Sequence, residues 1–350
     1  MKEVHMSESV LSRFPVMLVT GYSGSGKTTL IERLVSRLGE DGLTVAVIKH
    51  DTHGLHVDRP GKDSDRFFQA GATVIAHGPN EAFFRVPPAR AWDLQTAALH
   101  LLRSHDIVLV EGHKQTPIEA KIWLRSDADE PPPPEASDAV MDLSRSAPRF
   151  EQVYQYLRPW IEQQWRKTPV RAGFLIGGHS SRMGRPKHLL SYGTETWAER
   201  IAFTVSKHVD SVVVLGAGEL PSSLNDLQRL SDAPEWTGPL AGMRAAMRWD
   251  PLATWIFVAC DMPLVSGEAV EWLLGQRAPG RWAVLPRRDG TGQVEPLFAC
   301  YDYRAGTIIE HIARPKDIAS WPHAFLPPIP RELQNAWDNF NTRQEAAAIS

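Results

Sequence analysis

Near its N-terminus the chain has a glycine-rich loop between a short apolar segment and an amphipathic one. Residues 16–20 read Val-Met-Leu-Val-Thr, residues 21–28 read Gly-Tyr-Ser-Gly-Ser-Gly-Lys-Thr, and residues 27–38 carry apolar side chains at helical spacing. The loop fits the pattern G-x-x-x-x-G-K-[ST] of the phosphate-binding P-loop. Because such a loop joins a strand to the helix that follows it, we expect an α/β fold for this part of the chain.

Each residue type in this loop serves a phosphate group. Glycines let backbone N–H groups turn toward phosphate oxygens, Lys27 neutralises charge at the β- and γ-phosphates, and the Thr28 hydroxyl reaches Mg²⁺. The residues expected to bind the nucleotide here are Gly21, Gly24, Ser25, Gly26, Lys27, Thr28, Thr29 and Glu111.

A P-loop site also needs an acid at the end of a neighbouring strand. Glu111 ends the apolar segment 107–111, at a place where aspartate is commoner, and we predict that it binds Mg²⁺ together with Thr28. Two alternatives stay open. Glu111 could cap a loop, or Asp51, which follows the predicted strand 45–49, could take the same role.

Four histidines lie near these acids in the sequence. His50, His53 and His56 are spaced three apart, and His113 follows Glu111 by two positions. This spacing could serve a metal, but imidazoles beside a phosphate site more often form hydrogen bonds or face solvent. We favour the second interpretation.

Length and pattern predict two domains. The chain has 350 residues, more than one domain usually holds, and brief Val- and Ile-rich segments alternate with amphipathic ones, which favours mainly parallel sheets with helices on both faces. The predicted buried strands are 16–20, 45–49, 74–77, 107–111, 172–176, 212–215, 255–259 and 282–285. The predicted helices are 27–38, 92–102, 151–165, 196–209, 240–248 and 267–274.

A proline-rich acidic segment complicates the domain boundary. Residues 126–138 hold five acids, no base and four consecutive prolines, so they cannot form a helix or a central strand. We place them in a surface loop of the first domain, because the helix predicted at 151–165 needs a core to pack on and the nearest one is N-terminal. Pro169 ends that helix, and the predicted domains are residues 1–168 and 169–350.

Composition argues against several classes of protein. The 38 Lys and Arg residues against 41 Asp and Glu give a net charge of −3, which disfavours nucleic acid as the main partner. No apolar run approaches the roughly 18 residues of a membrane span, and residues 1–12 lack the apolar core of a signal peptide, so we expect a cytoplasmic protein without a membrane partner. Cys260 and Cys300 form no close metal-binding pair, which fits a reducing compartment.

A second glycine-rich loop follows the predicted strand 172–176. Residues 175–187 read Leu-Ile-Gly-Gly-His-Ser-Ser-Arg-Met-Gly-Arg-Pro-Lys, which fits neither a P-loop nor a dinucleotide-binding pattern. Its glycines let a nucleotide lie against the backbone, and Arg182 and Lys187 are spaced to hold a triphosphate from two sides. The alternative is a glycine turn with solvated basic residues.

Two acids of the second half complete this candidate site. Asp261 directly follows the apolar segment 256–260, and ligands of open α/β sheets bind at the carboxyl ends of strands. A carboxylate with phosphate oxygens and water suits Mg²⁺, although Asp261 could instead cap the next helix, whose start is closer to Ser266. Asp232 precedes the Gly-Pro-Leu-Ala-Gly block 238–242, which opens a helix whose N-terminus can face phosphate.

Four further blocks accompany the P-loop in the N-terminal half. They are Ile48-Lys49-His50-Asp51, Asp58 with Gly61-Lys62-Asp63-Ser64, Ala70-Gly71-Ala72 and Glu111-Gly112-His113-Lys114. Over about residues 14–165 the chain thereby resembles the GTP-binding accessory protein of molybdenum-cofactor guanylation, the MobB type.

The blocks of the C-terminal half resemble a second family, the molybdenum cofactor guanylyltransferases of the MobA type, over about residues 170–348. They are residues 175–187, Asp232 with 238–242, Cys260-Asp261-Met262-Pro263, Glu295-Pro296-Leu297 and Asn339-Phe340-Asn341-Thr342. The expected nucleotide-binding residues are Leu175, Ile176, Gly177, Gly178, Lys187, Asp232 and Asp261. The expected catalytic residues are Arg182, Lys187 and Asp261, the last as a magnesium ligand.

Together the resemblances imply a fusion of two three-layer α/β domains, an N-terminal P-loop NTPase fold and a C-terminal Rossmann-like nucleotidyltransferase fold. The implied reaction transfers GMP from GTP to molybdenum-molybdopterin and releases pyrophosphate, with the first domain binding GTP and assisting. The implied protein partners are molybdopterin-loading proteins and apo-molybdoenzymes.

One departure from the family pattern keeps alternatives open. Guanylyltransferases of this type can carry an asparagine after the second strand, where this chain reads Val214-Leu215-Gly216-Ala217. The transferase could therefore be a cytidylyltransferase or a nucleotide-sugar transferase of the same superfamily. The first domain could hydrolyse GTP weakly or be a non-catalytic nucleotide-binding adaptor.

Overall fold

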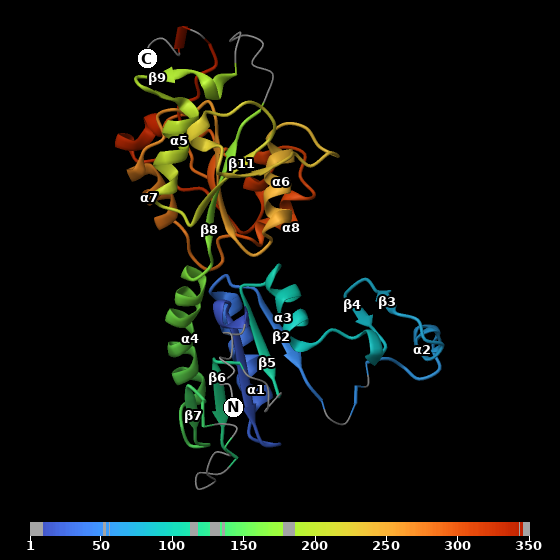
Figure 1. The fold of residues 1–350 in the computed structure, drawn as a ribbon. Helices are drawn as coiled ribbons and strands as arrows, with labels where there is room; N and C mark the ends of the chain where they lie inside the picture. The colour runs from blue at the N-terminus through green and yellow to red at the C-terminus, as the bar shows by residue number, and fades with distance from the viewer. Residues whose placement is uncertain are drawn as a thin grey trace, which may run out of the picture. The chain divides into compact units, whose positions relative to one another are not determined.

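The computed structural model describes residues 10–51, 54–55, 57–112, 118–126, 134, 137–177, 186–342 and 344–345. Internal contacts divide the chain into two units (Figure 1). The first contains the residues up to 155 except 42–44 and 103–106, and the second contains those two short segments and the residues from 156 onward. Most of the predicted surface loop 126–138 lies outside the described residues.

A five-stranded parallel sheet with the order β2-β5-β1-β6-β7 forms the centre of the first unit. Its strands are β1 (Val16–Gly21), β2 (Val45–Lys49), β5 (Ile107–Glu111), β6 (Lys121–Leu124) and β7 (Met141–Leu143). Because all five strands run the same way, their carboxyl ends all lie at the same end of the sheet. The P-loop follows β1 and Glu111 ends β5, so both lie at this carboxyl end.

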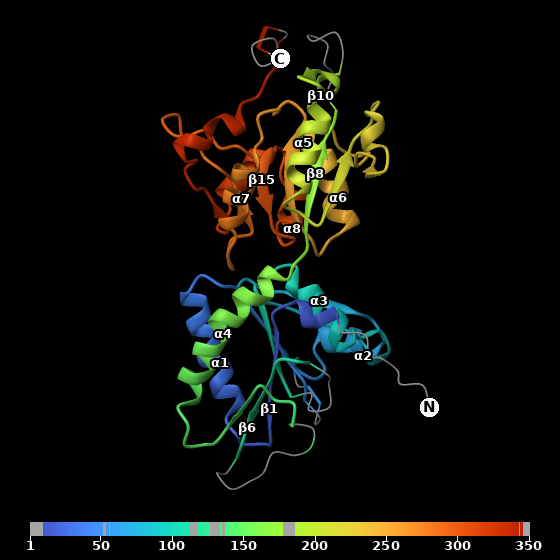
Figure 2. The same cartoon turned by 60° about the vertical axis from the view of Figure 1, so that its left-hand side comes forward.

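Helices cover both faces of this sheet. Figure 2 shows α1 (Lys27–Glu40) and the beginning of α4 (Arg149–Arg166), whose residues up to 155 belong to this unit, on one side and α3 (Leu94–Leu102) on the other. The apolar stripe of α1 is buried at Leu30, Ile31, Leu34 and Leu38. The predicted α/β architecture and its three helices are confirmed, with small shifts at their ends.

Two predicted buried strands of this unit are not buried. Val74–His77 is strand β3, which pairs antiparallel with β4 (Ala82–Arg85) in a separate hairpin, and Ile75 is 61% exposed. Figure 1 shows this hairpin and α2 (Asp63–Gln69) set apart from the main sheet. Strand β2 lies at the edge of the sheet, and only its Ala46 is buried. Apolar composition predicted the strands correctly but could not tell a central strand from an edge or a hairpin.

A seven-stranded sheet with the order β12-β11-β8-β13-β15-β14-β16 forms the centre of the second unit. The strands β12, β11, β8 and β13 are parallel, whereas β15 runs antiparallel to both of its neighbours. The strands are β8 (Val170–Leu175), β11 (Ser211–Leu215), β12 (Gln228–Leu230), β13 (Thr254–Ala259), β14 (Ala283–Val284), β15 (Phe298–Tyr301) and β16 (Ala324–Phe325). The sequence did not predict β12, β15 and β16.

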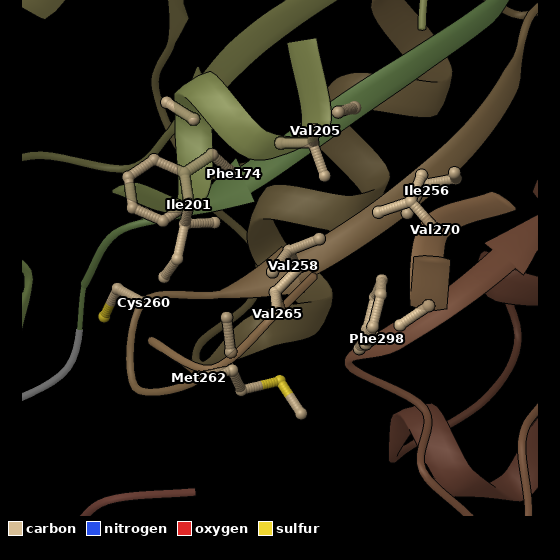
Figure 3. Close-up of a cluster of buried hydrophobic side chains, with 14 of the residues drawn as sticks. Phe174, Ile201, Val205, Ile256, Val258, Cys260, Met262, Val265, Val270 and Phe298 are labelled. Carbon is tan, nitrogen blue, oxygen red and sulfur yellow. The ribbon is translucent and has the colours of Figure 1, made fainter. Parts of the chain in front are cut away.

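Each face of this sheet has its own hydrophobic core. Figure 3 shows one of them, where Phe174 of β8 and Ile256 of β13 pack with Ile201 of α5 and Val270 of α7. The other face packs against α6 and α8 through Met243 and neighbouring side chains. The helices are α5 (Trp197–Ser206), α6 (Pro239–Trp249), α7 (Gly267–Gly275) and α8 (Ala305–Ile309). This unit is therefore also a three-layer α/β structure.

Short elements complete the fold. The strands β9 (Ser191–Tyr192) and β10 (Glu195–Thr196) form a small hairpin before α5. The 3-10 helices are η1 (Val10–Arg13), η2 (Pro88–Arg90), η4 (Lys187–Leu189), η5 (Ser222–Leu224), η6 (Pro315–Ser320) and η7 (Arg331–Trp337). Within the described parts of the chain, no helix combines the length and apolar character needed to cross a membrane.

Candidate functional site

The phosphate loop of the first unit connects β1 to α1 as the motif predicts. Gly26 lies directly before α1 with φ +89°, a left-handed conformation that favours glycine. A Cβ atom at Gly21 would come 2.3 Å from the carbonyl oxygen of Leu124, so no side chain fits there. Ser25 is buried inside the loop, and Thr29 is exposed on the first turn of α1.

The two chemically active side chains of this loop already have partners. Lys27 Nζ donates to the carbonyl oxygens of Tyr22 at 2.7 Å and Gly21 at 3.1 Å, so the ammonium lies over its own loop. The Thr28 hydroxyl, on the first turn of α1, donates to Oε1 of Glu111 at the end of β5, at 3.1 Å. The hydroxyl of Thr28 and the carboxylate of Glu111 therefore lie together at the carboxyl end of the sheet, where the phosphates are expected.

The alternatives to Glu111 are placed less favourably. Asp51 follows β2, which lies beyond β5 in the strand order, and its side chain is exposed. His53, His56 and His113 lie outside the described residues. In the remainder of the chain, no group of three or more histidine, cysteine and acidic side chains is arranged to hold a metal.

Arg149, which the sequence analysis missed, holds the phosphate loop from outside. Its guanidinium donates to four backbone carbonyl oxygens: Ser25 at 2.6 Å, Ser144 at 2.8 Å, Leu143 at 3.1 Å and Arg125 at 2.5 Å. The carbonyl of Ser25 and the N–H of Gly26 belong to one peptide unit and point in opposite directions. Because Arg149 binds that carbonyl, it fixes the orientation of the peptide unit that carries the Gly26 N–H.

The second glycine-rich loop begins where β8 ends. Leu175 is the last residue of β8, Ile176 is buried, and Gly177 has φ +147°. Gly178 and Arg182 lie outside the described residues. The chain is described again from Pro186, and Lys187 opens η4.

Lys187 brings together three segments that are distant in the sequence. Its Nζ lies 3.1 Å from Asp261 Oδ2 and donates to Asn341 Oδ1 at 2.7 Å. The backbone strengthens this arrangement, because the N–H of Phe340 donates to the carbonyl oxygen of Asp261 at 2.9 Å. Asn341 was part of a sequence motif but was not predicted as a site residue.

Asp232 lies with a different set of predicted residues. Its Oδ1 is 3.4 Å from the position of a Cβ atom at Gly242 and 3.8 Å from one at Gly216, so it packs against these two glycines. Partial desolvation raises the pKa of its carboxyl group. Gly216 in turn touches Ile176, and Gly242 touches Leu175, so Asp232 is close to the start of the glycine-rich loop.

The missing asparagine after the second strand has a steric explanation. A Cβ atom at Gly216, which has φ +106°, would lie 2.1 Å from the carbonyl oxygen of Ile176. No amide side chain can therefore stand at this position in this backbone. Arg229 holds the loop instead, because its guanidinium donates to the carbonyl oxygens of Gly216 at 3.0 Å and Gly218 at 2.8 Å.

The structural alternative for Asp261 is wrong. The helix α7 begins at Gly267, and its cap is Ser266, whose hydroxyl accepts the N–H of Ala269 at 3.3 Å. Cys260, beside Asp261, is buried, and burial raises the pKa of its thiol to about 11. Burial disfavours the thiolate form, whereas the side chain of Asp261 at the end of β13 is 23% exposed.

Comparisons with known proteins match both halves of the chain. The family described as molybdopterin guanine dinucleotide synthesis protein B, MobB, matches residues 16–143, and the family described as MobA-like NTP transferase domain matches residues 172–322. The molybdopterin-guanine dinucleotide biosynthesis adapter protein of Haemophilus influenzae is 35% identical over 164 residues, which are 43% of this chain and 91% of that protein.

Two further similarities concern the second half. A protein of Pelotomaculum thermopropionicum named "Probable molybdenum cofactor guanylyltransferase" is 33% identical over 141 residues, 40% of this chain and 67% of its own length. The crystal structure of molybdopterin-guanine dinucleotide biosynthesis protein A from Archaeoglobus fulgidus is 24% identical, with a TM-score of 0.41, and covers 51% of this chain and 96% of its own.

The chain belongs to the MobB family in its N-terminal half and to the MobA-like NTP transferase family in its C-terminal half. The resemblance seen in the sequence is confirmed, and so is the prediction that this fusion is a nucleotidyltransferase. Both families take part in molybdenum cofactor biosynthesis. The MobA-like match includes Lys187, Asp232 and Asp261.

The role of Arg149 can be tested on residues 1–168, which span the MobB match. We expect Arg149→Lys to weaken GTP binding about tenfold, because a lysine keeps the charge but cannot donate to four carbonyls. Isothermal titration with GTP measures the effect. Arg145→Lys, four positions earlier on an exposed side chain, is the matched control, and Lys27→Ala should abolish binding. Unchanged affinity in Arg149→Lys would show that Arg149 does not shape the phosphate site.

Proposed function

We propose that the chain transfers GMP from GTP to molybdenum-molybdopterin, forming the guanine dinucleotide cofactor and pyrophosphate. The observation that carries this proposal is the contact between Lys187 and Asp261 at the carboxyl end of β13. It places a cation and a carboxylate together beside the glycine-rich loop of a MobA-like domain. The guanylyltransferase names of the relatives support guanine as the base.

The reaction needs no general base. The attacking group is the terminal phosphate of molybdopterin, and a phosphate monoester with its second pKa near ~6 is largely ionised at neutral pH. One of its oxygens forms a bond to the α-phosphorus of GTP, and the bond from that phosphorus to the β-bridging oxygen breaks. The electron pair leaves with pyrophosphate. The main obstacle is therefore the repulsion between two anions.

The chain supplies positive charge where the anions meet. Lys187 would exchange its contact with Asp261 for the GTP phosphates, and Arg182 would hold the same phosphates from the opposite side. With both groups held in line, the transfer depends mainly on position. Asp232, beside Leu175 and Ile176, would place the nucleotide at the start of the loop.

Oxygen donors in both halves fit Mg²⁺. Asp261 follows the end of β13 with its side chain 23% exposed, and the Thr28 hydroxyl lies 3.1 Å from Glu111 Oε1 in the first unit. Carboxylate and hydroxyl oxygens together with phosphate oxygens are the ligands that this ion prefers. When bound, Mg²⁺ would neutralise phosphate charge and stabilise the leaving pyrophosphate.

We assign the two roles to the two predicted domains. Residues 169–350 would carry the transfer, and residues 1–168 would bind GTP at the P-loop and assist. The adapter name of the Haemophilus influenzae relative supports an assisting role for the first domain. Molybdopterin-loading proteins and apo-molybdoenzymes would be the partners before and after the reaction.

A comparison of nucleotides tests the proposed reaction. Pyrophosphate release is measured with GTP, CTP, ATP and UTP, each with and without purified molybdenum-molybdopterin, and the product is identified by mass spectrometry. We expect release only with GTP and the cofactor together. A cytidine dinucleotide product would overturn the guanine assignment, and release that depends on a sugar phosphate would overturn the cofactor assignment.

The role of Asp261 predicts the effect of a nearly isosteric change. We expect Asp261→Asn to keep the fold but to slow guanylyl transfer by about 10²–10³-fold, because one electrostatic contact of the transition state is lost. The rate is measured across a Mg²⁺ titration, with thermal melting as a check on folding.

Ser266→Ala in the same loop is the matched control for Asp261→Asn. It removes the cap of α7, so it should cost about 1 kcal/mol of stability while transfer continues. Normal melting with near-normal turnover of Asp261→Asn at low Mg²⁺ would contradict the assignment of Asp261.

A further inference from the structure

The Glu295-Pro296-Leu297 block has no role in the reaction described so far, yet its carboxylate is buried. The side chain of Glu295 is 5% exposed, and burial raises the pKa of its carboxyl group while the neighbouring Arg288 opposes this shift. A buried carboxylate is costly unless a cation and hydrogen bonds compensate it. The contacts of the cation that compensates Glu295 should therefore indicate the role of the block.

That partner, Arg288, contacts three acceptors at once. Its Nε donates to Glu295 Oε1, its Nη1 donates to Asp338 Oδ1 at 2.8 Å, and its Nη2 donates to the carbonyl oxygen of Trp337. Glu295 lies seven residues from Arg288, whereas Trp337 and Asp338 lie about fifty residues away at the end of η7. The guanidinium thus ties its own loop to the C-terminal segment.

The C-terminal segment is anchored in the core at Trp337 and contacts Asp261 and Lys187 a few residues later. Trp337 is fully buried, and its indole N–H donates to the carbonyl oxygen of Phe298 at 2.8 Å. Three residues later the N–H of Phe340 donates to the carbonyl oxygen of Asp261, and Asn341 accepts from Lys187. Only Asp338 and Asn339 separate the residue that is anchored in the core from these two contacts.

From these contacts we propose that Arg288 is a positioning residue for nucleotidyl transfer. It holds Trp337 and Asp338 so that Phe340 and Asn341 lie against Asp261 and Lys187, and Glu295 fixes the guanidinium in turn. Each of its three nitrogen atoms already donates to an acceptor of the chain, which favours a positioning role over substrate binding. This inference rests on the proposed function, because it assumes that the second unit transfers a nucleotidyl group. It does not depend on which base that nucleotidyl group carries.

The planar guanidinium group of arginine fits the three acceptors that surround residue 288. Lysine carries the same charge at one point and cannot reach three acceptors in different directions. The pair with Asp338 adds little stability by itself, because the side chain of Asp338 is 42% exposed. Its value is geometric, since a displacement of about 1 Å at a reacting group can cost about 10²-fold in rate.

Arg288→Lys in the full chain gives the kinetic test. We expect kcat for transfer to fall about 10- to 100-fold while KM for GTP changes less than about threefold, because positioning is lost but nucleotide contacts remain. Arg331→Lys is the matched control: Arg331 pairs with Asp289 of the same loop at 3.6 Å and its side chain is 91% exposed. Equal rates for the two variants would overturn the proposal.

A double-mutant cycle separates positioning from general loss of structure. Because Arg288 acts partly through Asn341, the step from Asn341→Ala to the double variant Arg288→Lys with Asn341→Ala should slow transfer by a smaller factor than Arg288→Lys does in the wild-type chain. Effects that multiply would show independent roles and would overturn the proposal. Asp338→Asn offers a milder change, and we expect it to lower kcat in the same direction by a smaller factor.

Hydrogen exchange provides a readout that does not require transfer activity. In Arg288→Lys the amide of Phe340 should exchange at least about tenfold faster, whereas the amide of Cys260, which donates to Leu175, should be unchanged. Unchanged exchange at Phe340 would overturn the proposal even if no nucleotide is transferred. Absence of transfer by the wild-type chain, with faster exchange in the variant, would instead reject the proposed function alone.

Discussion

The ammonium group of Lys187 joins three segments of the second unit at the proposed transfer site. It lies 3.1 Å from Asp261 and 2.7 Å from Asn341, and so joins the segment after the glycine-rich loop, the end of β13 and the C-terminal segment. None of these segments is long enough to define a site alone. In the proposed reaction, a nucleotide that draws Lys187 to its phosphates would free the Asp261 carboxylate, and substrate binding would thereby expose the proposed magnesium ligand.

Both halves of the chain have the same arrangement of a strand, a glycine-rich loop, a lysine and an acid. Each has a buried parallel strand that ends in a glycine-rich loop, with a lysine in the loop or just after it and an acid at the end of an adjacent strand. The partners of the lysines differ. Lys27 donates to carbonyl oxygens of its own loop, whereas Lys187 contacts a carboxylate seventy-four residues away. Both sites also depend on distant residues, since Arg149 and Glu111 contact the first loop and its helix, and Asp261 and Asn341 contact Lys187.

Local signals in the sequence predicted much of this fold. The strands 45–49 and 107–111 agree with the structure to the residue, and the P-loop motif correctly predicted a strand before the loop and a helix that begins at Lys27. Burial was predicted less well. Ile75 and Val47 have the composition of core strands, but a hairpin and a sheet edge leave them exposed, and strand order is a property of tertiary structure.

The residues that sequence reasoning missed all act over long distances. Arg149 reaches Ser25 and Arg288 reaches Asp338 through contacts that no local pattern encodes. Asn341 stood in a recognised motif, but only its contact with Lys187 shows why the motif matters. The buried Glu295 offered a signal, since a carboxylate beside Pro and Leu calls for a cation, yet the sequence alone could not identify Arg288 as that cation.

If Lys187 and Asp261 form the transfer centre, single-turnover transfer by Lys187→Met should be slow. Methionine keeps the length and apolar stem of lysine but removes the charge. With GTP and cofactor in saturating amounts, we expect transfer slower by at least about 10²-fold, with unchanged melting. A rate within about twofold of the wild-type chain would contradict it and would place the chemistry elsewhere in the second unit.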